Sequence, residues 1–127
     1  MKKKHKINYL PIAQQDLIDI FDYIREDNPT AAAKFIDKID KSISKLELFP
    51  KLGVVPKDDR LEFFGYRMLV IDSYLVFYVI IENIVEIRRI IRKQKIFFFI
   101  ISVLFKLHIY PTTGAGLPCL PFPWHQS

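Results

Sequence analysis

Cysteine is nearly absent from this sequence. Cys119 is the single cysteine, so the chain offers no disulfide framework, no cysteine-based zinc site and no redox pair. This composition is typical of the reducing cytosol, and we therefore expect a cytoplasmic protein. We expect no export signal either, because the apolar stretch at residues 7–12 is too short and too interrupted for the core of a signal peptide.

Long apolar runs are also missing. The longest, at residues 96–105, spans ten positions that are apolar except for Ser102, and it has basic residues on both sides. A transmembrane helix needs ~20 consecutive apolar residues. We therefore expect no membrane-spanning helix and no membrane partner.

The motifs that mark catalytic centres are lacking as well. The three histidines, His5, His108 and His125, are scattered without metal-ligand spacing. No serine stands in a recognisable nucleophile motif. We expect no metal and no small-molecule cofactor, and the sequence assigns no catalytic residue.

What the chain does have is a large apolar content and an uneven charge. Half of its 127 residues are hydrophobic, which is enough for one packed domain. The net charge is +5, with residues 7–50 acidic overall and residues 51–95 basic. Such a basic protein is expected to present a face to an anionic partner, either a nucleic acid or an acidic protein segment.

Residues 6–50 predict a short strand followed by two antiparallel helices. The strand covers residues 6–10, and Pro11 is well placed to open a helix that continues to about Asp27. The acidic residues of this helix lie opposite its apolar arc and are interpreted as a solvated face: Asp16, Asp19, Asp22 and Glu26. Thr30 is expected to cap the second helix, which ends near Phe49-Pro50.

The segment after the helices predicts an antiparallel sheet. Three runs rich in β-branched and aromatic residues cover 66–71, 74–81 and 84–91 and are separated by two-residue polar connections. Such short connections indicate an antiparallel meander. Residues 61–64 are expected to add a short edge strand. With the two-helix hairpin packed on one face of this small sheet, the predicted fold class is α+β.

A basic cluster stands at the end of the last run. It consists of Arg88, Arg89, Arg92, Lys93 and Lys95. Strand alternation places Arg89 on the same face as Val85, Ile87 and Ile91, where a lone guanidinium is costly unless it is paired. Two interpretations stay open for Arg89: a structural ion pair with a helix carboxylate, or a functional role.

The other candidate residues have a structural interpretation beside the functional one. Arg67 stands at a strand start, where its stem can lie on apolar surface while its head reaches water. Arg88 and Arg92 share a strand face with an acidic residue, which indicates a solvated surface, or they contact a polyanion together with the two lysines. Tyr66 and Tyr78 either stack on bases or pack in the core.

Six short motifs stand in order along residues 4–92. They are Tyr9-Leu10-Pro11 before Asp16-Leu17, Tyr23-Ile24, Phe49-Pro50, Gly65-Tyr66-Arg67-x-Leu69, Tyr74-Leu75-Val76-Phe77-Tyr78 and Ile87-x-Arg89-Ile90. In this combination the chain resembles the RelE/ParE toxin superfamily of bacterial type II toxin–antitoxin systems, in its ParE-like branch. The resemblance implies a β-α-α-β-β-β fold, a cognate antitoxin that wraps the toxin, and toxicity through DNA gyrase or through ribosome-dependent mRNA cleavage.

The resemblance leaves three functions open. We expect the toxin of a plasmid-stabilisation system, which inhibits growth by binding gyrase and is not an enzyme. The alternative is a RelE-like endoribonuclease acting on ribosome-bound mRNA, although family ribonucleases usually carry an arginine where this chain has Tyr74-Leu75-Val76. The third is a decayed member that poisons nothing. Candidates for contact with the antitoxin or the target are Arg67, Arg88, Arg89, Arg92, Lys93, Lys95, Tyr66 and Tyr78.

The chain departs from the family pattern after residue 92. Members commonly continue with a Gly-Arg-Arg-Asp-Tyr-like stretch, whereas this chain has Lys93-Gln94-Lys95-Ile96-Phe97. We expect a toxin domain over residues 1–95 and an atypical tail over 96–127, first apolar and then proline-rich. Its composition leads to the hypothesis of a frameshifted or rearranged C-terminus.

Overall fold

The computed structural model describes residues 4–96 and residue 99. The chain divides into two compact units, Met1–Lys93 and Gln94–Ser127. All of the sheet and both long helices belong to the first unit. Apart from residues 96 and 99, the predicted tail lies outside the described residues.

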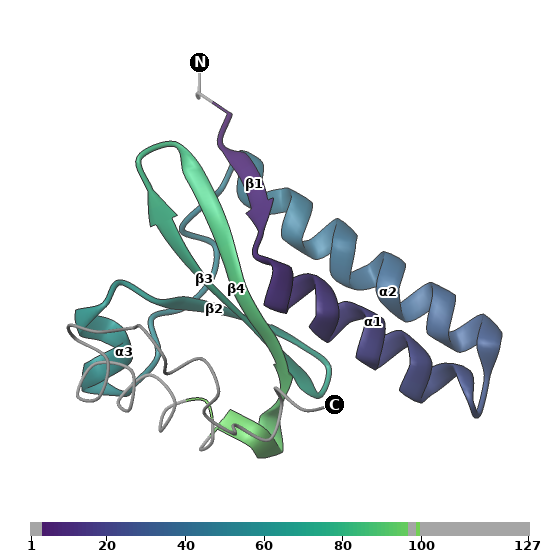
Figure 1. Ribbon diagram of the computed structural model, residues 1–127. Coiled ribbons are helices and arrows are strands. Elements are labelled where there is room, and N and C mark those ends of the chain that lie inside the picture. Colours follow the sequence, from purple (N-terminus) through teal and green to yellow (C-terminus); the bar gives the residue numbers. More distant parts are fainter. Residues whose placement is uncertain (1–3, 97–98, 100–127) are drawn as a thin grey trace, which may run out of the picture. The chain divides into compact units, whose positions relative to one another are not determined.

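The first unit is a helix hairpin on a four-stranded sheet (Figure 1). In chain order its elements are β1 (Lys6–Tyr9), α1 (Pro11–Arg25), α2 (Pro29–Ser44), the short 3-10 helix η1 (Lys45–Glu47), α3 (Asp59–Phe63), β2 (Arg67–Ile71), β3 (Tyr74–Ile81) and β4 (Ile84–Arg92). A further 3-10 turn, η2 (Lys93–Lys95), follows β4. The predicted α+β class is confirmed.

The sheet has the strand order β1-β4-β3-β2. β2, β3 and β4 form the predicted antiparallel meander, and β1 pairs with β4 in parallel. The two hairpin connections begin at Asp72 and Glu82, whose φ angles are 54° and 56°. Left-handed backbone of this kind gives a tight connection that follows the twist of its strands.

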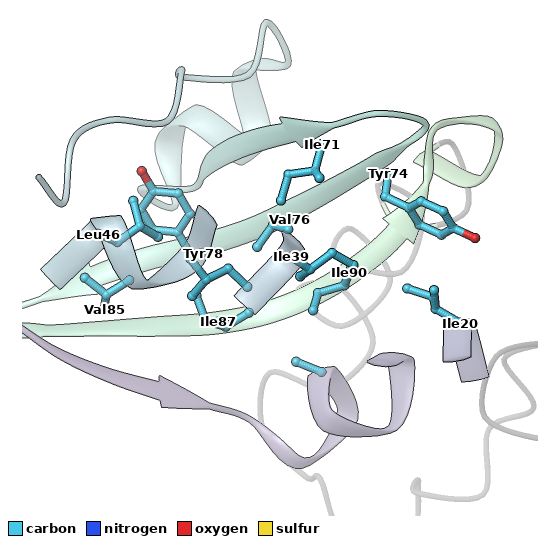
Figure 2. Close-up of a cluster of buried hydrophobic side chains, with 12 residues drawn as sticks. Ile20, Ile39, Leu46, Ile71, Tyr74, Val76, Tyr78, Val85, Ile87 and Ile90 are labelled. Carbon is cyan, nitrogen blue, oxygen red and sulfur yellow. The ribbon is translucent and has the colours of Figure 1, made fainter. Parts of the chain in front are cut away.

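The two long helices cover one face of the sheet. Their apolar stripes pack against alternate residues of β3 and β4, and Figure 2 shows the resulting cluster. Its members include Ile20, Ile39, Ile43 and Leu46 from the helical half and Val76, Tyr78, Val85, Ile87 and Ile90 from the sheet. β3 is buried from Tyr74 to Val79, as expected for the almost wholly apolar middle strand.

The start of α2 differs from the prediction. Asn28, and not Thr30, is the N-cap: its side-chain oxygen accepts a hydrogen bond from the Ala31 N–H at 3.1 Å. Pro29 explains the difference, because a proline at the first helical position lacks an N–H and has its φ already fixed for the helix. The cap therefore falls on the residue before it.

The predicted edge strand at residues 61–64 is wrong. These residues belong largely to α3, whose N-cap Asp58 accepts hydrogen bonds from the N–H groups of Arg60 and Leu61 at 2.9 and 3.1 Å. Leu61 is fully buried and anchors the turn. Side-chain capping thus decides the local structure against the strand preference of the apolar residues.

No helix within the described part of the chain is long and apolar enough to cross a membrane.

Candidate functional site

The arginines of β4 are arranged by a β-bulge. Tyr78 of β3 pairs with Ile87, but the preceding residue, Phe77, pairs with Arg89. Arg88 is therefore an extra residue, and the two-residue alternation of the strand is broken there. The expectation that Arg89 shares the face of Ile87 is wrong, because Ile90 takes that place in the core cluster.

Arg89 forms a buried ion pair with Asp16 of α1. Its Nε and Nη2 donate to the two carboxylate oxygens at 2.8 and 3.0 Å. The Ile90 N–H donates a third hydrogen bond to Asp16 at 2.9 Å. The relative exposure of the two side chains is only 8% and 11%. The structural ion pair considered for Arg89 is therefore present.

Asp16 does not belong to the solvated face predicted for α1, although Asp19, Asp22 and Glu26 are exposed. β1 ends at Tyr9, opposite Ile87, so among the described residues no strand pairs with the next stretch of this edge of β4. The Asp16 carboxylate accepts the hydrogen bond of the Ile90 N–H, which a neighbouring strand would otherwise accept. Burial raises the pKa of the Asp16 carboxyl, and the Arg89 guanidinium and this N–H oppose the shift.

Tyr78 and Arg67 hold the loop that follows η1. The Tyr78 hydroxyl donates to the Pro50 carbonyl at 2.8 Å and accepts from the Gly53 N–H at 2.9 Å. Arg67 donates to the carbonyls of Gly53 and Lys51 at 3.2 and 3.3 Å. The Arg67 head is thus bonded to backbone and does not simply snorkel to water. Both residues have a structural task in the fold.

Gly53 is required by the closeness of this contact. A Cβ atom at residue 53 would lie 2.6 Å from the Tyr78 hydroxyl oxygen and 2.8 Å from the Met68 carbonyl oxygen. Only glycine allows the loop backbone to approach the tyrosine so closely.

Arg88 points to a different set of partners. Its Nε lies 2.8 Å from a carboxylate oxygen of Glu86, and its guanidinium carbon lies 5.7 Å from the centroid of the Tyr66 ring. Tyr66 is buried and packs edge-on against Phe77. The predicted pairing of Arg88 with an acidic neighbour is therefore present.

Arg92 is separated from Arg88 by the bulge and contacts α1. Its guanidinium carbon lies 5.3 Å from the centroid of the Tyr23 ring. The expectation that Arg88 and Arg92 share one strand face is wrong for this reason. Lys93 and Lys95, which follow in the sequence, are exposed. In the sequence Tyr23 stands out only as part of the Tyr23-Ile24 motif, because no local pattern indicates a contact between α1 and the end of β4.

Within residues 4–96 and 99, no group of three or more His, Cys, Asp or Glu side chains could hold a metal ion. The chemistry that the described candidate residues offer is ion pairing, hydrogen bonding and cation–π contact.

These features define a small α+β protein with basic residues at the end of its last strand. Residues 7–97 match the family model described as the ParE toxin of the type II toxin-antitoxin system, parDE. The chain belongs to this family, and the resemblance inferred from its motifs is confirmed.

A solved structure supports the fold. The chain is similar to one from the chromosomal ParDE TA system from P. aeruginosa, with a TM-score of 0.61 and 20% sequence identity. The match covers 72% of this chain and 98% of that one. No match was found among curated proteins.

Proposed function

We propose that this chain is the toxin of a type II toxin–antitoxin system, that it inhibits growth by binding DNA gyrase in the cytoplasm, and that a cognate antitoxin neutralises it. The observation that carries the proposal is the family match over residues 7–97. The proposed inhibition is by binding, without a bond change in the target. A gyrase inhibitor of this kind needs a complementary surface and no proton-transfer group.

The cations at the end of β4 are the proposed contacts with an acidic antitoxin segment. Arg67 and Arg89 donate hydrogen bonds within the fold, and Arg88 pairs with Glu86. The Tyr66 ring and the Tyr78 hydroxyl are buried. Cations that stand close together in the sequence and keep contact with water add favourably for an acidic partner, and Lys93 and Lys95 are exposed while Arg92 is half-buried. This role therefore falls on Arg92, Lys93 and Lys95.

The proposed domain limits follow from the strand pairings. We propose residues 1–95 as the toxin domain and residues 96–127 as an atypical C-terminal tail, first apolar and then proline-rich. Every strand pairing of the described sheet lies between Lys6 and Arg92.

Pulse-labelling of DNA and protein synthesis in bacterial cells, within minutes of inducing residues 1–127 without antitoxin, tests the target. An early fall in DNA synthesis is the expected result. An early fall in translation contradicts gyrase as the target and favours the mRNA endoribonuclease. If neither falls while soluble protein accumulates, the chain is a non-toxic family member.

Purified gyrase gives the direct test. Negative supercoiling of a relaxed plasmid should fall as the purified chain is added, and the co-expressed product of a small acidic reading frame beside the gene should restore it. Supercoiling that continues with the chain in excess over gyrase would contradict the proposed mechanism.

A further inference from the structure

The Arg92 side chain differs from the other arginines of the sheet. Arg67 is bonded to loop carbonyls, Arg88 to Glu86, and Arg89 to Asp16. Within residues 4–96 and 99, the Arg92 guanidinium has a contact with the Tyr23 ring but no hydrogen bond or ion pair. Its five N–H donors are therefore available to a ligand.

This guanidinium is nevertheless held in place. It lies against the Tyr23 ring, whose side chain is 61% exposed, and residue 92 stands directly opposite Tyr74 in the β3–β4 register. Burial raises the pKa of the Tyr74 hydroxyl, and Arg92 lies near enough to oppose that shift. A stacked guanidinium loses less freedom when it binds than a free side chain does. The three side chains thus present an oriented donor group at the end of the sheet.

The surroundings of Tyr23 distinguish between possible anions. Asp19 and Glu26 stand four residues before and three residues after Tyr23, so they are its neighbours on the helix surface. Both are exposed. A nucleic acid laid across this site would bring several phosphates into the neighbourhood of these carboxylates, whereas a partner with one carboxylate brings a single negative charge and so meets less repulsion. The local charge therefore favours a single carboxylate over a polyanion.

We propose that Arg92, stacked on Tyr23 beside Tyr74, is a receptor for one aspartate or glutamate side chain of a partner protein. The guanidinium binds the carboxylate through two parallel N–H···O hydrogen bonds. The inference rests on the proposed function only in naming the antitoxin as the natural source of that side chain. It refines the proposed role of the basic strand end, because one residue of the cluster supplies geometric recognition and the lysines supply charge.

The test is an NMR titration of the full 127-residue chain with two probes. One is the capped peptide acetyl-Leu-Glu-Leu-amide, which carries a single carboxylate, and the other is a tetrathymidylate. We expect the peptide to shift the Arg92 Nε–H and Tyr23 ring resonances in a saturable manner. Absence of saturable shifts at these groups, or tighter binding of the tetrathymidylate, would overturn the proposal in favour of no receptor or of a nucleic-acid site.

Variants separate recognition from charge. Arg92→Gln and Arg92→Lys should each weaken peptide binding about tenfold or more, because lysine keeps the charge but lacks the planar fork. Arg25→Gln is the matched control: the Arg25 guanidinium lies 5.7 Å from the Phe21 ring centroid on the same helix but is already paired with Asp22 at 3.1 Å. Its binding should stay at the wild-type level. If Arg92→Lys bound the peptide with wild-type affinity, a positive charge alone would be sufficient for binding. That result would contradict the proposed receptor.

The readout is independent of toxicity. The titration needs neither gyrase nor an antitoxin. A chain that does not inhibit growth would therefore not contradict the receptor, and absence of peptide binding would not contradict gyrase inhibition. Amide spectra of each variant verify that the fold is kept. Tyr23→Leu is a second test of the receptor. It leaves the arginine in place and should weaken peptide binding by removing the stacking surface.

Discussion

The Asp16 carboxylate is bonded both to a side chain and to the backbone of β4. It receives three hydrogen bonds, two from Arg89 and one from the Ile90 N–H. Because the pair is almost excluded from water, each charge depends on the other to offset its loss of solvation. The pair joins α1 to β4 next to the bulge, which in turn decides where the following arginines point.

Asp16→Ala should therefore destabilise the protein strongly. Removing one partner of a buried pair leaves an uncompensated charge and costs about 3–5 kcal/mol in the free energy of unfolding. Asp19→Ala, at an exposed position on the same helix, should change it by less than about 0.5 kcal/mol. Urea unfolding followed by circular dichroism measures both. Equal effects of the two substitutions would show that the pair contributes little.

Tyr78→Phe tests the hold on the loop at residues 50–53. The substitution removes only the hydroxyl that bonds Pro50 and Gly53. The buried backbone groups left without a partner should cost about 1–3 kcal/mol. Tyr23→Phe, at an exposed ring, is the control and should stay within about 0.5 kcal/mol of wild type. Amide exchange at Gly53 should accelerate in Tyr78→Phe alone.

The same tyrosine predicts a loss of stability in alkali. Burial raises the pKa of the Tyr78 hydroxyl. Above about pH 10, where an unperturbed tyrosine titrates, the unfolded chain gives up a proton that the folded chain retains. The folded state then binds more protons, so stability falls as the pH rises. Between about pH 9 and about pH 11, Tyr78→Phe should lose less stability than wild type, and an equal loss would contradict this assignment.

At the scale of elements, capping decides where helices begin. Asn28 caps α2 directly before Pro29, and Asp58 turns a strand-like stretch into α3. In both cases one short polar side chain satisfies backbone N–H groups that would otherwise lack a partner. The apolar pattern indicates that an element exists, whereas the cap fixes its start and sometimes its type.

Asn28→Ala should shorten or fray the start of α2. Loss of an N-cap costs about 0.5–2 kcal/mol. Thr30→Ala, two residues on, should have a much smaller effect, although Thr30 is the residue that the sequence pattern favours as the cap. Thermal unfolding of both variants gives the comparison, and a larger effect at Thr30 would reverse the assignment.

The β4 bulge is an element-scale feature with consequences for the site. One extra residue sends Arg88 toward Tyr66 and Arg92 toward Tyr23. Regular alternation would have placed the two arginines on one face. The residues of the basic cluster therefore do not form one continuous surface, because Arg88 and Arg92 contact different aromatic rings.

At the scale of the molecule, the proposed domain limits predict an independent fold. A chain of residues 1–95 keeps all described strand pairings and both long helices. It should unfold cooperatively and give dispersed amide resonances for β1 to β4. A truncated chain with a collapsed, poorly dispersed spectrum would contradict the boundary and assign the tail a part in the core.

Much of this fold could be predicted from local pattern. The limits of β3 agree with the predicted run at residues 74–81, and α1 begins at Pro11 as expected. Periodicity, proline and two-residue turns are properties of neighbouring residues, so the sequence by itself determined the order of the main elements, the α+β class and the family.

Only the tertiary structure decided which charged groups meet. Asp16 and Arg89 are 73 positions apart, and Tyr23 and Arg92 come from different elements. Their contacts depend on the strand register and on the edge that β1 leaves open, and one bulged residue changes both the alternation and the facing side chains. A carboxylate in an acidic helix face and an arginine in a basic cluster look like their neighbours in the sequence, because burial and pairing arise only when distant segments pack together.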